Sequence, residues 1–191
     1  MPRPALKSKK CRQCGEDFHP SGGMQVACSL VCALEQSREK QQRSADKMAR
    51  ERLRLGRDAL KTRSEYVKEA AVSVHKYIRA RDKGKPCISC GVYEQERFTG
   101  GHFDAGHYRS TGAAPHMRFN LLNIFGQCKQ CNRNLSGNTV EMRKGVIQRI
   151  GIDLVESIEC DNGIVRFDIP YLKRMKRIFN KRARYYLKRR G

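Results

Sequence analysis

Eight of the nine cysteines fall into two sets of four, and this spacing constrains the fold more than any other feature of the sequence. In each set, two close pairs of cysteines are separated by a longer segment, an arrangement that lets four thiolates converge on one Zn²⁺ ion. Gly91 follows the first pair of the second set and lets the chain turn back. We therefore predict two structural zinc sites, formed by Cys11, Cys14, Cys28 and Cys32 and by Cys87, Cys90, Cys128 and Cys131.

Disulfide bonds are the alternative use of paired cysteines, and they form in oxidising compartments. The chain begins Met1-Pro2-Arg3 and shows no apolar region of a secretory signal, so we expect a cytoplasmic protein with zinc-bound thiolates. The ninth cysteine, Cys160, has no partner at metal-binding spacing. We expect it to be a small buried hydrophobic side chain without a function.

The composition is strongly basic, with 40 Lys and Arg residues against 19 Asp and Glu residues and a formal net charge of +21. Two zinc sites with four thiolates each would change this charge by only about −4. The sequence contains neither an apolar run of about 18 residues, as a transmembrane helix needs, nor a basic segment with a strong apolar face. We therefore expect a nucleic acid as the partner, and no membrane.

The fold class predicted from these features is α+β: small zinc-stabilised modules joined and flanked by helices. Residues 1–34 hold a basic arm and the first cysteine set, in the pattern of a treble-clef finger. Residues 35–63 are rich in Glu, Gln, Lys, Arg and Ala and contain no Pro, which favours a solvated linker helix. Residues 64–151 contain the second set, and residues 152–191 form a basic, helical segment that we expect to bind DNA.

A second helix is expected from Thr62, where Thr62-Arg-Ser-Glu65 has the form of a capping box, to about Arg81. Its apolar face should pack on the second zinc module. His75 stands beside this face and has no Cys or carboxylate three or four residues later, so we interpret it as a core-edge or phosphate-facing histidine and not as a ligand. The apolar face consists of Val67, Ala70, Ala71, Val74, Tyr77 and Ile78.

The segment between the two pairs of the second set holds the polar residues of greatest interest. Residues 98–108, FTGGHFDAGHY, indicate a short bent hairpin arm that carries His102, Asp104 and His107. After a loop, the chain reaches Cys131-Asn132, where a short helix should begin. The predicted order is strand, loop, helix.

Three further elements and a final helix are expected in the C-terminal part. Helices are predicted over 140–150 and 152–158, a strand over 164–168, and a last helix after Pro170. The basic side chains of that last helix have no acidic neighbour in the sequence, so we expect their repulsion to destabilise the helix until DNA phosphates neutralise them. The expected DNA-binding residues are Lys173, Arg174, Lys176, Arg177, Lys181, Arg182, Arg184 and Lys188.

Three residues match the anchor positions of HNH endonucleases, whose fold is a ββα-metal module: His107, Asn123 in the frame NxxxxCxxC, and Asn132 directly after Cys131. Longer motifs resemble the NinG/Rap family of lambdoid phages, whose members are recombination endonucleases. These motifs are RPALKSKKCRQCG, GKPCISCG, AGHYRSTGAAPHMRFN, QCKQCN and LSGN. The resemblance covers roughly residues 2–151. It implies a phage-encoded, structure-selective DNA endonuclease that cleaves Holliday junctions and D-loops in the bacterial cytoplasm.

The chemistry of phosphodiester hydrolysis suits these residues. We expect His107 to be the general base, Asn123 to orient it or to brace the loop carbonyl that does so, and Asn132 to bind a catalytic Mg²⁺ or Mn²⁺ ion. Many HNH sites have Asp or His immediately before the base, where this chain has Gly106. The second ligand is then Asp104, which we favour, or His102. Asn120 competes with Asn123 for the middle role.

Two other function classes stay open at the level of sequence. One is a non-catalytic, zinc-dependent DNA-binding accessory protein of recombination, and the other is an RNA-binding treble-clef protein, which the 7% content of aromatic residues disfavours. Paired cuts on a two-fold junction would suit a homodimer. By family resemblance, a recombinase would be a functional partner.

Overall fold

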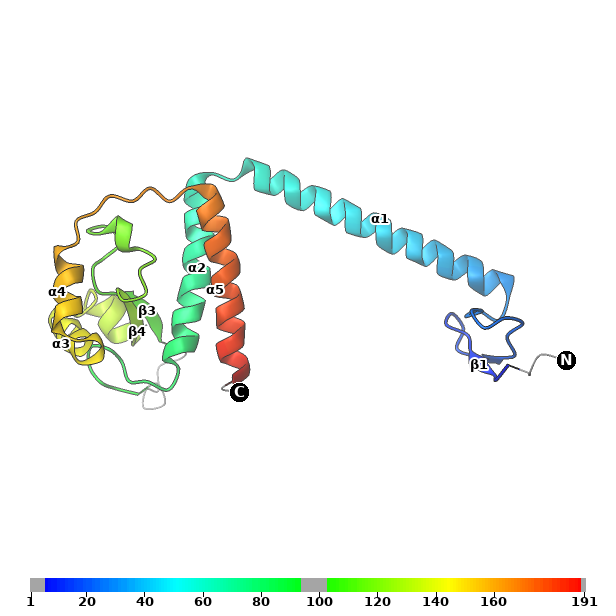
Figure 1. The fold of residues 1–191 in the computed structure, drawn as a ribbon, viewed down its shortest axis with the longest axis horizontal. Helices are drawn as coiled ribbons and strands as arrows, with labels where there is room; N and C mark the ends of the chain where they lie inside the picture. The colour runs from blue at the N-terminus through cyan, green and yellow to red at the C-terminus, as the bar shows by residue number, and fades with distance from the viewer. Residues whose placement is uncertain (1–5, 94–102, 190–191) are drawn as a thin grey trace. The chain divides into compact units, whose positions relative to one another are not determined.

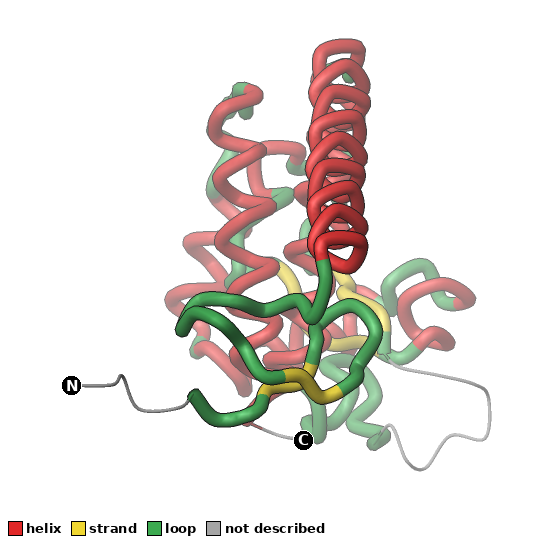
Figure 2. The backbone as a smooth tube through the Cα atoms, turned by 90° about the vertical axis from the view of Figure 1, so that its right-hand side faces the viewer, coloured by secondary structure: helices red, strands yellow, loops and turns green. Residues whose placement is uncertain are grey.

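The computed structural model describes residues 6–93 and 103–189 (Figure 1). By its internal contacts the chain divides into two compact units, Met1–Lys61 and Thr62–Gly191. Helices and loops make up most of the described chain, and its strands are only two to four residues long (Figure 2). This mixture confirms the predicted α+β class. No helix within the described ranges is both long and apolar enough to cross a lipid bilayer.

The first unit consists of a small hairpin, a looped region and one long helix. β1 (Lys9–Lys10) pairs antiparallel with β2 (Asp17–Phe18), and α1 runs over Leu30–Leu60. Ser29 caps α1, because its Oγ accepts the backbone N–H of Cys32 at 3.2 Å. No residue of α1 is buried, which confirms the predicted linker helix as a solvated one.

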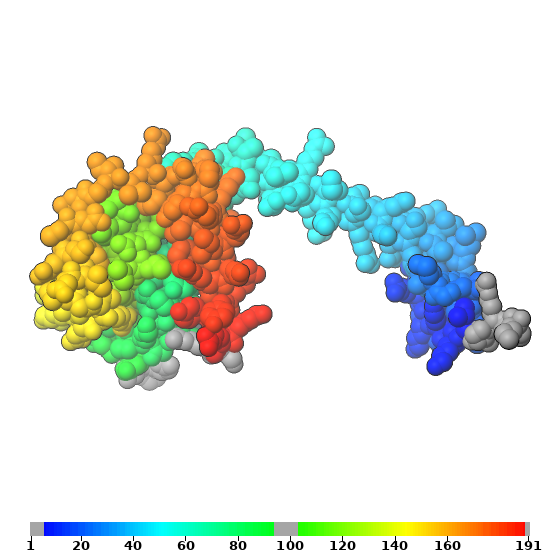
Figure 3. Space-filling view, viewed as in Figure 1, coloured from blue at the N-terminus to red at the C-terminus, as the bar shows by residue number. Residues whose placement is uncertain are grey.

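α2 (Arg63–Asp82) and α5 (Ile169–Arg189) pack along each other in the second unit (Figure 1). The predicted capping box starts α2: the N–H of Thr62 donates to Oε2 of Glu65 at 2.7 Å, and the Glu65 N–H donates back to Oγ1 at 3.4 Å. The other side of α5 is exposed (orange to red in Figure 3). The core between the two helices includes Ala70, Val74, Tyr77, Ile78, Leu172, Phe179 and Ala183.

The second unit also holds a two-stranded sheet made from distant segments. β3 (Asp104–His107) and β4 (Ile124–Gln127) pair antiparallel, with His107 opposite Ile124. Because side chains alternate across a strand, Ile124 enters the core of α2 and α5 while Phe125 enters a second core on the other face. The predicted packing of α2 on this module is confirmed.

This pairing differs from the hairpin arm that the sequence predicts over residues 98–108. The described end of that arm, β3, takes its partner from β4, because every residue of β4 is buried and its side chains fill cores on both faces. Residues 94–102, which include His102, lie outside the described residues. The loop between the two strands contains the short helix η2 (Pro115–Met117).

Three helical segments follow β4: η3 (Gln130–Asn134), α3 (Thr139–Ile150) and α4 (Ile152–Cys160). They confirm the predicted short helix after the second cysteine pair and the two helices beyond it. Gly145 of α3 lies directly against the first cysteine pair of this module. A Cβ at this position would stand 1.7 Å from the carbonyl oxygen of Ile88. Glycine lowers the stability of an isolated helix, but here it allows α3 to pack closely against the segment that contains Ile88.

Two predictions for the C-terminal part are wrong. The predicted strand over 164–168 is an irregular segment, because no strand of the described chain lies beside it, and Ile164 is 99% exposed. Cys160 is exposed and not buried. It lies two residues after the buried Ile158, about 200° further around α4, and therefore faces solvent.

Candidate functional site

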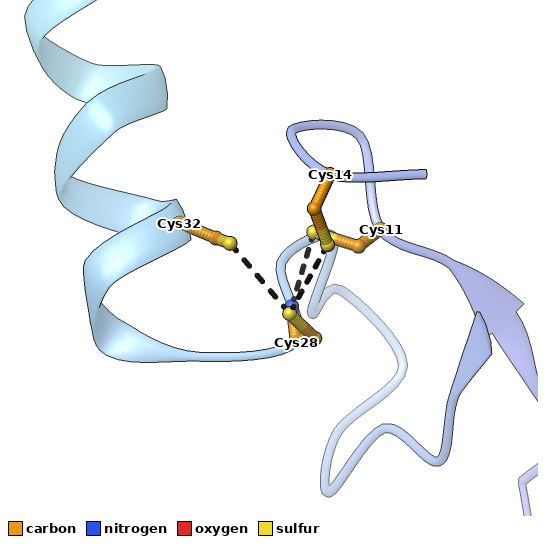
Figure 4. A group of neighbouring side chains, drawn as sticks. All are labelled: Cys11, Cys14, Cys28 and Cys32. Atoms are coloured by element: carbon orange, nitrogen blue, oxygen red, sulfur yellow. Dashed lines mark hydrogen bonds between the residues drawn. The ribbon is translucent and has the colours of Figure 1, made fainter. Parts of the chain in front are cut away.

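The first cysteine set converges at the start of α1 (Figure 4). Cys11 and Cys14 come from the turn after β1, Cys28 from the loop before α1 and Cys32 from its first turn. The Sγ atoms of Cys14 and Cys28 are 3.6 Å apart, as are those of Cys28 and Cys32. The backbone N–H of Cys28 points to Sγ of Cys11 at 3.4 Å. All four sulfurs lie within 4.8 Å of one another.

The second set joins three parts of the second unit. Cys87 and Cys90 follow α2, Cys128 follows β4, and Cys131 belongs to η3. The Sγ atoms of Cys90 and Cys128 are 3.7 Å apart. Backbone N–H groups point at two sulfurs, that of Cys128 at Cys87 (3.3 Å) and that of Cys131 at Cys128 (3.4 Å). These four sulfurs also lie within 4.8 Å of one another.

Both sets have the geometry of a tetrahedral thiolate site. Four sulfurs bound to one Zn²⁺ at about 2.3 Å lie about 3.8 Å apart, close to the 3.6 and 3.7 Å observed, whereas a disulfide joins two sulfurs at about 2 Å. Neighbouring thiols, Cys14 first, raise the pKa of Cys28 to about 12, and burial raises that of Cys131 to about 12. These protons leave when a cation binds, so each set can hold a zinc ion.

His107 ends β3 and is half-buried at the start of the loop that leads to β4. Its Nε2 lies 3.1 Å from the carbonyl oxygen of Arg118. Because a carbonyl only accepts, Nε2 carries the proton and Nδ1 keeps its lone pair. Burial lowers the pKa of His107 below its ordinary value of 6.5, although the bond to the Arg118 carbonyl acts in the opposite direction. The ring is therefore neutral at pH 7 and has one nitrogen that can accept a proton.

Asn123 braces the loop that carries this carbonyl. Its side chain is fully buried just before β4. Oδ1 accepts the backbone N–H of Arg109 at 2.7 Å, and Nδ2 donates to the carbonyl oxygens of Arg109 at 3.0 Å and of Met117 at 3.4 Å. Met117 directly precedes Arg118, so the amide supports the backbone that binds His107 and does not contact the ring.

Neighbouring asparagines make local contacts. Oδ1 of Asn120 accepts the backbone N–H of Leu122 at 2.9 Å and forms a turn. Asn138 occupies the N-cap position of α3, but its amide donates to Sγ of Cys131 at 3.6 Å. Of the two asparagines that the sequence offers for the middle role, Asn123 is therefore the one whose side chain holds the loop beside the histidine.

Asp104 and Asn132 meet where β3 begins and η3 turns. Nδ2 of Asn132 donates to Oδ2 of Asp104 at 3.1 Å, and Arg133 donates to both carboxylate oxygens, at 2.7 and 2.9 Å. Burial alone would raise the pKa of Asp104, but Arg133 and Asn132 outweigh it and hold the pKa below 3.8. The carboxylate is therefore charged at neutral pH. A carboxylate beside an amide offers the oxygen ligands that Mg²⁺ and Mn²⁺ prefer.

The sequence indicates only a core-edge or phosphate-facing position for His75, and the structure places its ring against that of His107. The ring centroids are 5.5 Å apart and the ring planes meet at 70°. Burial, followed by electrostatic effects of His107, Arg79 and Arg118, lowers the pKa of His75 to about 4. Its place beside the apolar face of α2 is visible in the sequence, but the contact is not, because it depends on how α2 packs on β3.

The exposed side of α5 carries a stripe of basic residues that recur every three or four positions. Cations of α5 also lie over aromatic rings: Lys173 is 5.0 Å from the ring centroid of Tyr66, and Arg182 is 5.4 Å from that of Phe179. This stripe consists of Lys173, Arg177, Lys181, Arg184 and Lys188. It offers a row of charges to a phosphate backbone.

One expectation for α5 needs correction. Lys176 does have an acidic partner, because Glu69 of α2 lies 2.8 Å from its Nζ. Leu172 and Phe179 of the same helix are buried against α2, and packing of such an apolar face is the main source of helix stability in proteins.

Comparison with known proteins places the whole chain in one family. The family model described as Bacteriophage Lambda NinG protein matches residues 3–189. The chain is 39% identical to Protein ninG of Escherichia phage lambda over 190 residues, which cover 92% of this chain and 91% of that protein. It is 38% identical to Protein ninG of Salmonella phage P22 over 190 residues, with the same coverage of both chains. No solved structure matches. With the motifs, cysteine sets and coverage in agreement, this chain belongs to the NinG family of bacteriophage proteins.

Proposed function

We propose that this protein is a metal-dependent DNA endonuclease that cleaves branched recombination intermediates. The observation that carries the proposal is the setting of His107, whose Nε2 is bound by the Arg118 carbonyl while Nδ1 keeps its lone pair. The segments β3, β4 and η3 follow one another in the ββα order of HNH endonucleases. The second cysteine set brackets them, so a zinc ion would fix their ends together.

In the proposed reaction, Nδ1 of His107 takes a proton from a water molecule whose oxygen attacks the phosphorus atom. The bond from phosphorus to the 3′ oxygen breaks, and that oxygen then takes up a proton from solvent. Throughout, the carbonyl of Arg118 accepts the N–H of Nε2, so the ring keeps its orientation while it becomes positive. Asn123 holds the backbone beside that carbonyl.

Asp104 and Asn132 would hold the catalytic divalent ion, Mg²⁺ or Mn²⁺. Rotation of the Asn132 side-chain amide by half a turn would direct its oxygen, in place of Nδ2, toward the Asp104 carboxylate. The side chain of Arg133 is 62% exposed and has room to move away from that carboxylate. A divalent ion there would supply the positive charge that stabilises the leaving oxygen. His102 stays a predicted further ligand.

Branched DNA is the proposed substrate because the basic surface suits phosphates and carries no evident pattern for reading bases. Contacts between Lys or Arg and phosphates give affinity without sequence information. Selection would then depend on the shape of the DNA. Two copies would act on a two-fold junction, so we expect a homodimer there, with a recombinase as a functional partner.

Gel analysis of an end-labelled four-way junction, a D-loop and a linear duplex tests this function. We compare wild type, His107→Ala and, as the control, His116→Ala, whose Nε2 also lies near a backbone carbonyl, that of Asp161 at 3.0 Å. Wild type and the control should cut branched DNA in Mg²⁺ or Mn²⁺ and not in EDTA. His107→Ala should bind the DNA but cut it about 10²- to 10⁴-fold more slowly. Unimpaired cutting by His107→Ala would refute the assigned base.

The ion pair between Asp104 and Arg133 favours a second candidate, a non-catalytic zinc-dependent DNA-binding protein that assists recombination. In that case the guanidinium would neutralise the carboxylate permanently, and no divalent ion would bind. Junction binding without cutting in any metal would support this candidate over the endonuclease.

A further inference from the structure

His75 is a half-buried histidine that the mechanism above does not use. Its ring lies 5.5 Å from that of His107, in a T-shaped arrangement. Among the residues that the structure describes, no hydrogen-bond partner is found for His75, whereas His107 and His116 each lie within hydrogen-bond distance of a backbone carbonyl. Among the described residues, His75 is not one of those with a fully buried polar atom that lacks a partner, so its ring nitrogens reach solvent and can meet a ligand.

A role as metal ligand does not fit this environment. Within residues 6–93 and 103–189, the two cysteine sets are the only groups of three or more His, Cys, Asp or Glu side chains that converge closely enough for a metal. Asp104 and His107 therefore form no such group with His75. Magnesium also prefers oxygen ligands to imidazole.

A role as second general base does not fit either. The pKa of His75 is lowered to about 4, first by burial and then by His107, Arg79 and Arg118, against a smaller opposing effect of Asp104. At neutral pH the ring is uncharged and a weak proton acceptor. Such a ring still carries one N–H group, which can donate a hydrogen bond.

The surroundings of His75 suit a phosphate. The positive charges of Arg79 and Arg118 lie near its ring. Further along α2, Lys76 and Arg79 line an open cavity of about 430 Å³ together with Phe103. A DNA strand that crosses His107 would therefore find positive charge near this ring.

We propose that the neutral imidazole of His75 donates its N–H to a non-bridging oxygen of the phosphate that is being cleaved. The inference rests on the proposed endonuclease function and adds a catalytic residue from α2 to the site on the ββα segments. Charge on the non-bridging oxygens grows in the transition state, so a fixed donor stabilises that state more than the substrate. Because the His75 ring does not titrate near neutral pH, its N–H group is available as a donor throughout the neutral pH range.

Three variants separate this role from simple packing. His75→Phe keeps a ring beside His107 but has no N–H, His75→Asn keeps an N–H donor without a ring, and His75→Ala has neither. Single-turnover cleavage of a four-way junction is measured with enzyme in excess, alongside zinc content, melting temperature and junction affinity. We expect Ala and Phe to slow cleavage about 100-fold at unchanged affinity and zinc content, and Asn to restore most of the rate.

A phosphorothioate at the cleaved position gives a second readout. Replacing the contacted oxygen by sulfur should slow wild type and His75→Asn, but should add little to the defect of His75→Phe, because the donor is already missing. Phe cleaving as fast as wild type would overturn the inference and leave the endonuclease intact. If wild type cuts no DNA with any metal, the endonuclease itself fails, and the role of His75 with it.

Discussion

Gln127 fills the space that a side chain at position 106 would need. A Cβ on Gly106 would stand 2.1 Å from Oε1 of Gln127 and 3.1 Å from its Cβ, while Nε2 of this fully buried glutamine donates to Oγ of Ser89 at 2.7 Å. Position 106 is where many HNH sites carry a metal ligand. Asp104, two residues earlier, lies on the same face of β3, and in the proposed nuclease site it would be the ligand in place of residue 106.

Gly106→Ala should therefore destabilise the second unit. The new methyl group would push against a buried side chain that is fixed by hydrogen bonds, and overpacking of this kind costs about 1–3 kcal/mol. Chemical denaturation measures the free energy of unfolding. Gly112→Ala is the matched control, because the atom nearest to the added carbon, Oγ of Ser110, is 3.9 Å away. Equal stability of the two variants would contradict the steric argument.

Arg133→Ala should tighten binding of the catalytic ion. The guanidinium competes with any cation for Asp104, which it contacts at 2.7 and 2.9 Å. Without it, half-maximal cleavage should need several-fold less Mn²⁺. Arg143→Ala removes a similar pair with Glu159 elsewhere in the unit and serves as the control. A higher Mn²⁺ requirement in Arg133→Ala would mean that the arginine assists the site.

Zinc content should fall by one ion per chain in Cys14→Ser and by one in Cys128→Ser, from two in the wild type. The two cysteine sets belong to separate compact units, so Cys14→Ser should leave the unfolding transition of the second unit in place. Native mass spectrometry and calorimetry measure these effects. Cys160→Ser, an exposed cysteine outside both sets, should keep two ions.

Acid should weaken the wild-type fold partly through His75. Its pKa is about 4 in the folded chain against 6.5 for an ordinary histidine, so the unfolded chain binds the extra proton between these values. The contribution of neutral His75 to stability is complete above pH 6.5 and is lost as the pH falls toward 4. Denaturation at pH 7, 6 and 5 should show a smaller decline for His75→Asn than for wild type. Parallel declines would mean that His75 titrates normally.

Loss of charge from α5 should weaken DNA binding in a salt-dependent way. Lys181 and Arg184 belong to the exposed basic stripe, and each phosphate contact contributes about 0.9 to the slope of log affinity against log salt. The double variant Lys181→Ala/Arg184→Ala should lower that slope by about 1.8. Lys176→Ala, whose lysine is paired with Glu69, should change it less. An unchanged slope in the double variant would exclude the stripe as a DNA surface.

Local patterns predicted much of this molecule. The capping box of Thr62 and Glu65 depends on residues three positions apart, and each cysteine pair depends on a short turn, so both are readable from the sequence. In the NxxxxCxxC motif, the spacing between Asn123 and Cys128 covers only one strand, β4. These features need no knowledge of how the distant segments meet.

Tertiary packing decided what the sequence could not predict. The partner of β3 lies beyond a long loop, and burial of β4 on both faces selects it. Cys160 faces outward because the buried face of α4 is set by Val155 and Ile158. The approach of His75 to His107 depends on how α2 crosses the sheet, for which a single sequence holds no signal.

The buried amide of Asn123 has a consequence for the kinetics of the site. Its three hydrogen bonds to Arg109 and Met117 tie the two ends of the loop together within the fold. The conformational entropy of that loop is therefore lost when the chain folds and not when the substrate binds. In the proposed endonuclease, binding energy from the DNA backbone would then not be needed to order the carbonyl that binds His107, and would be available to distort the branch point.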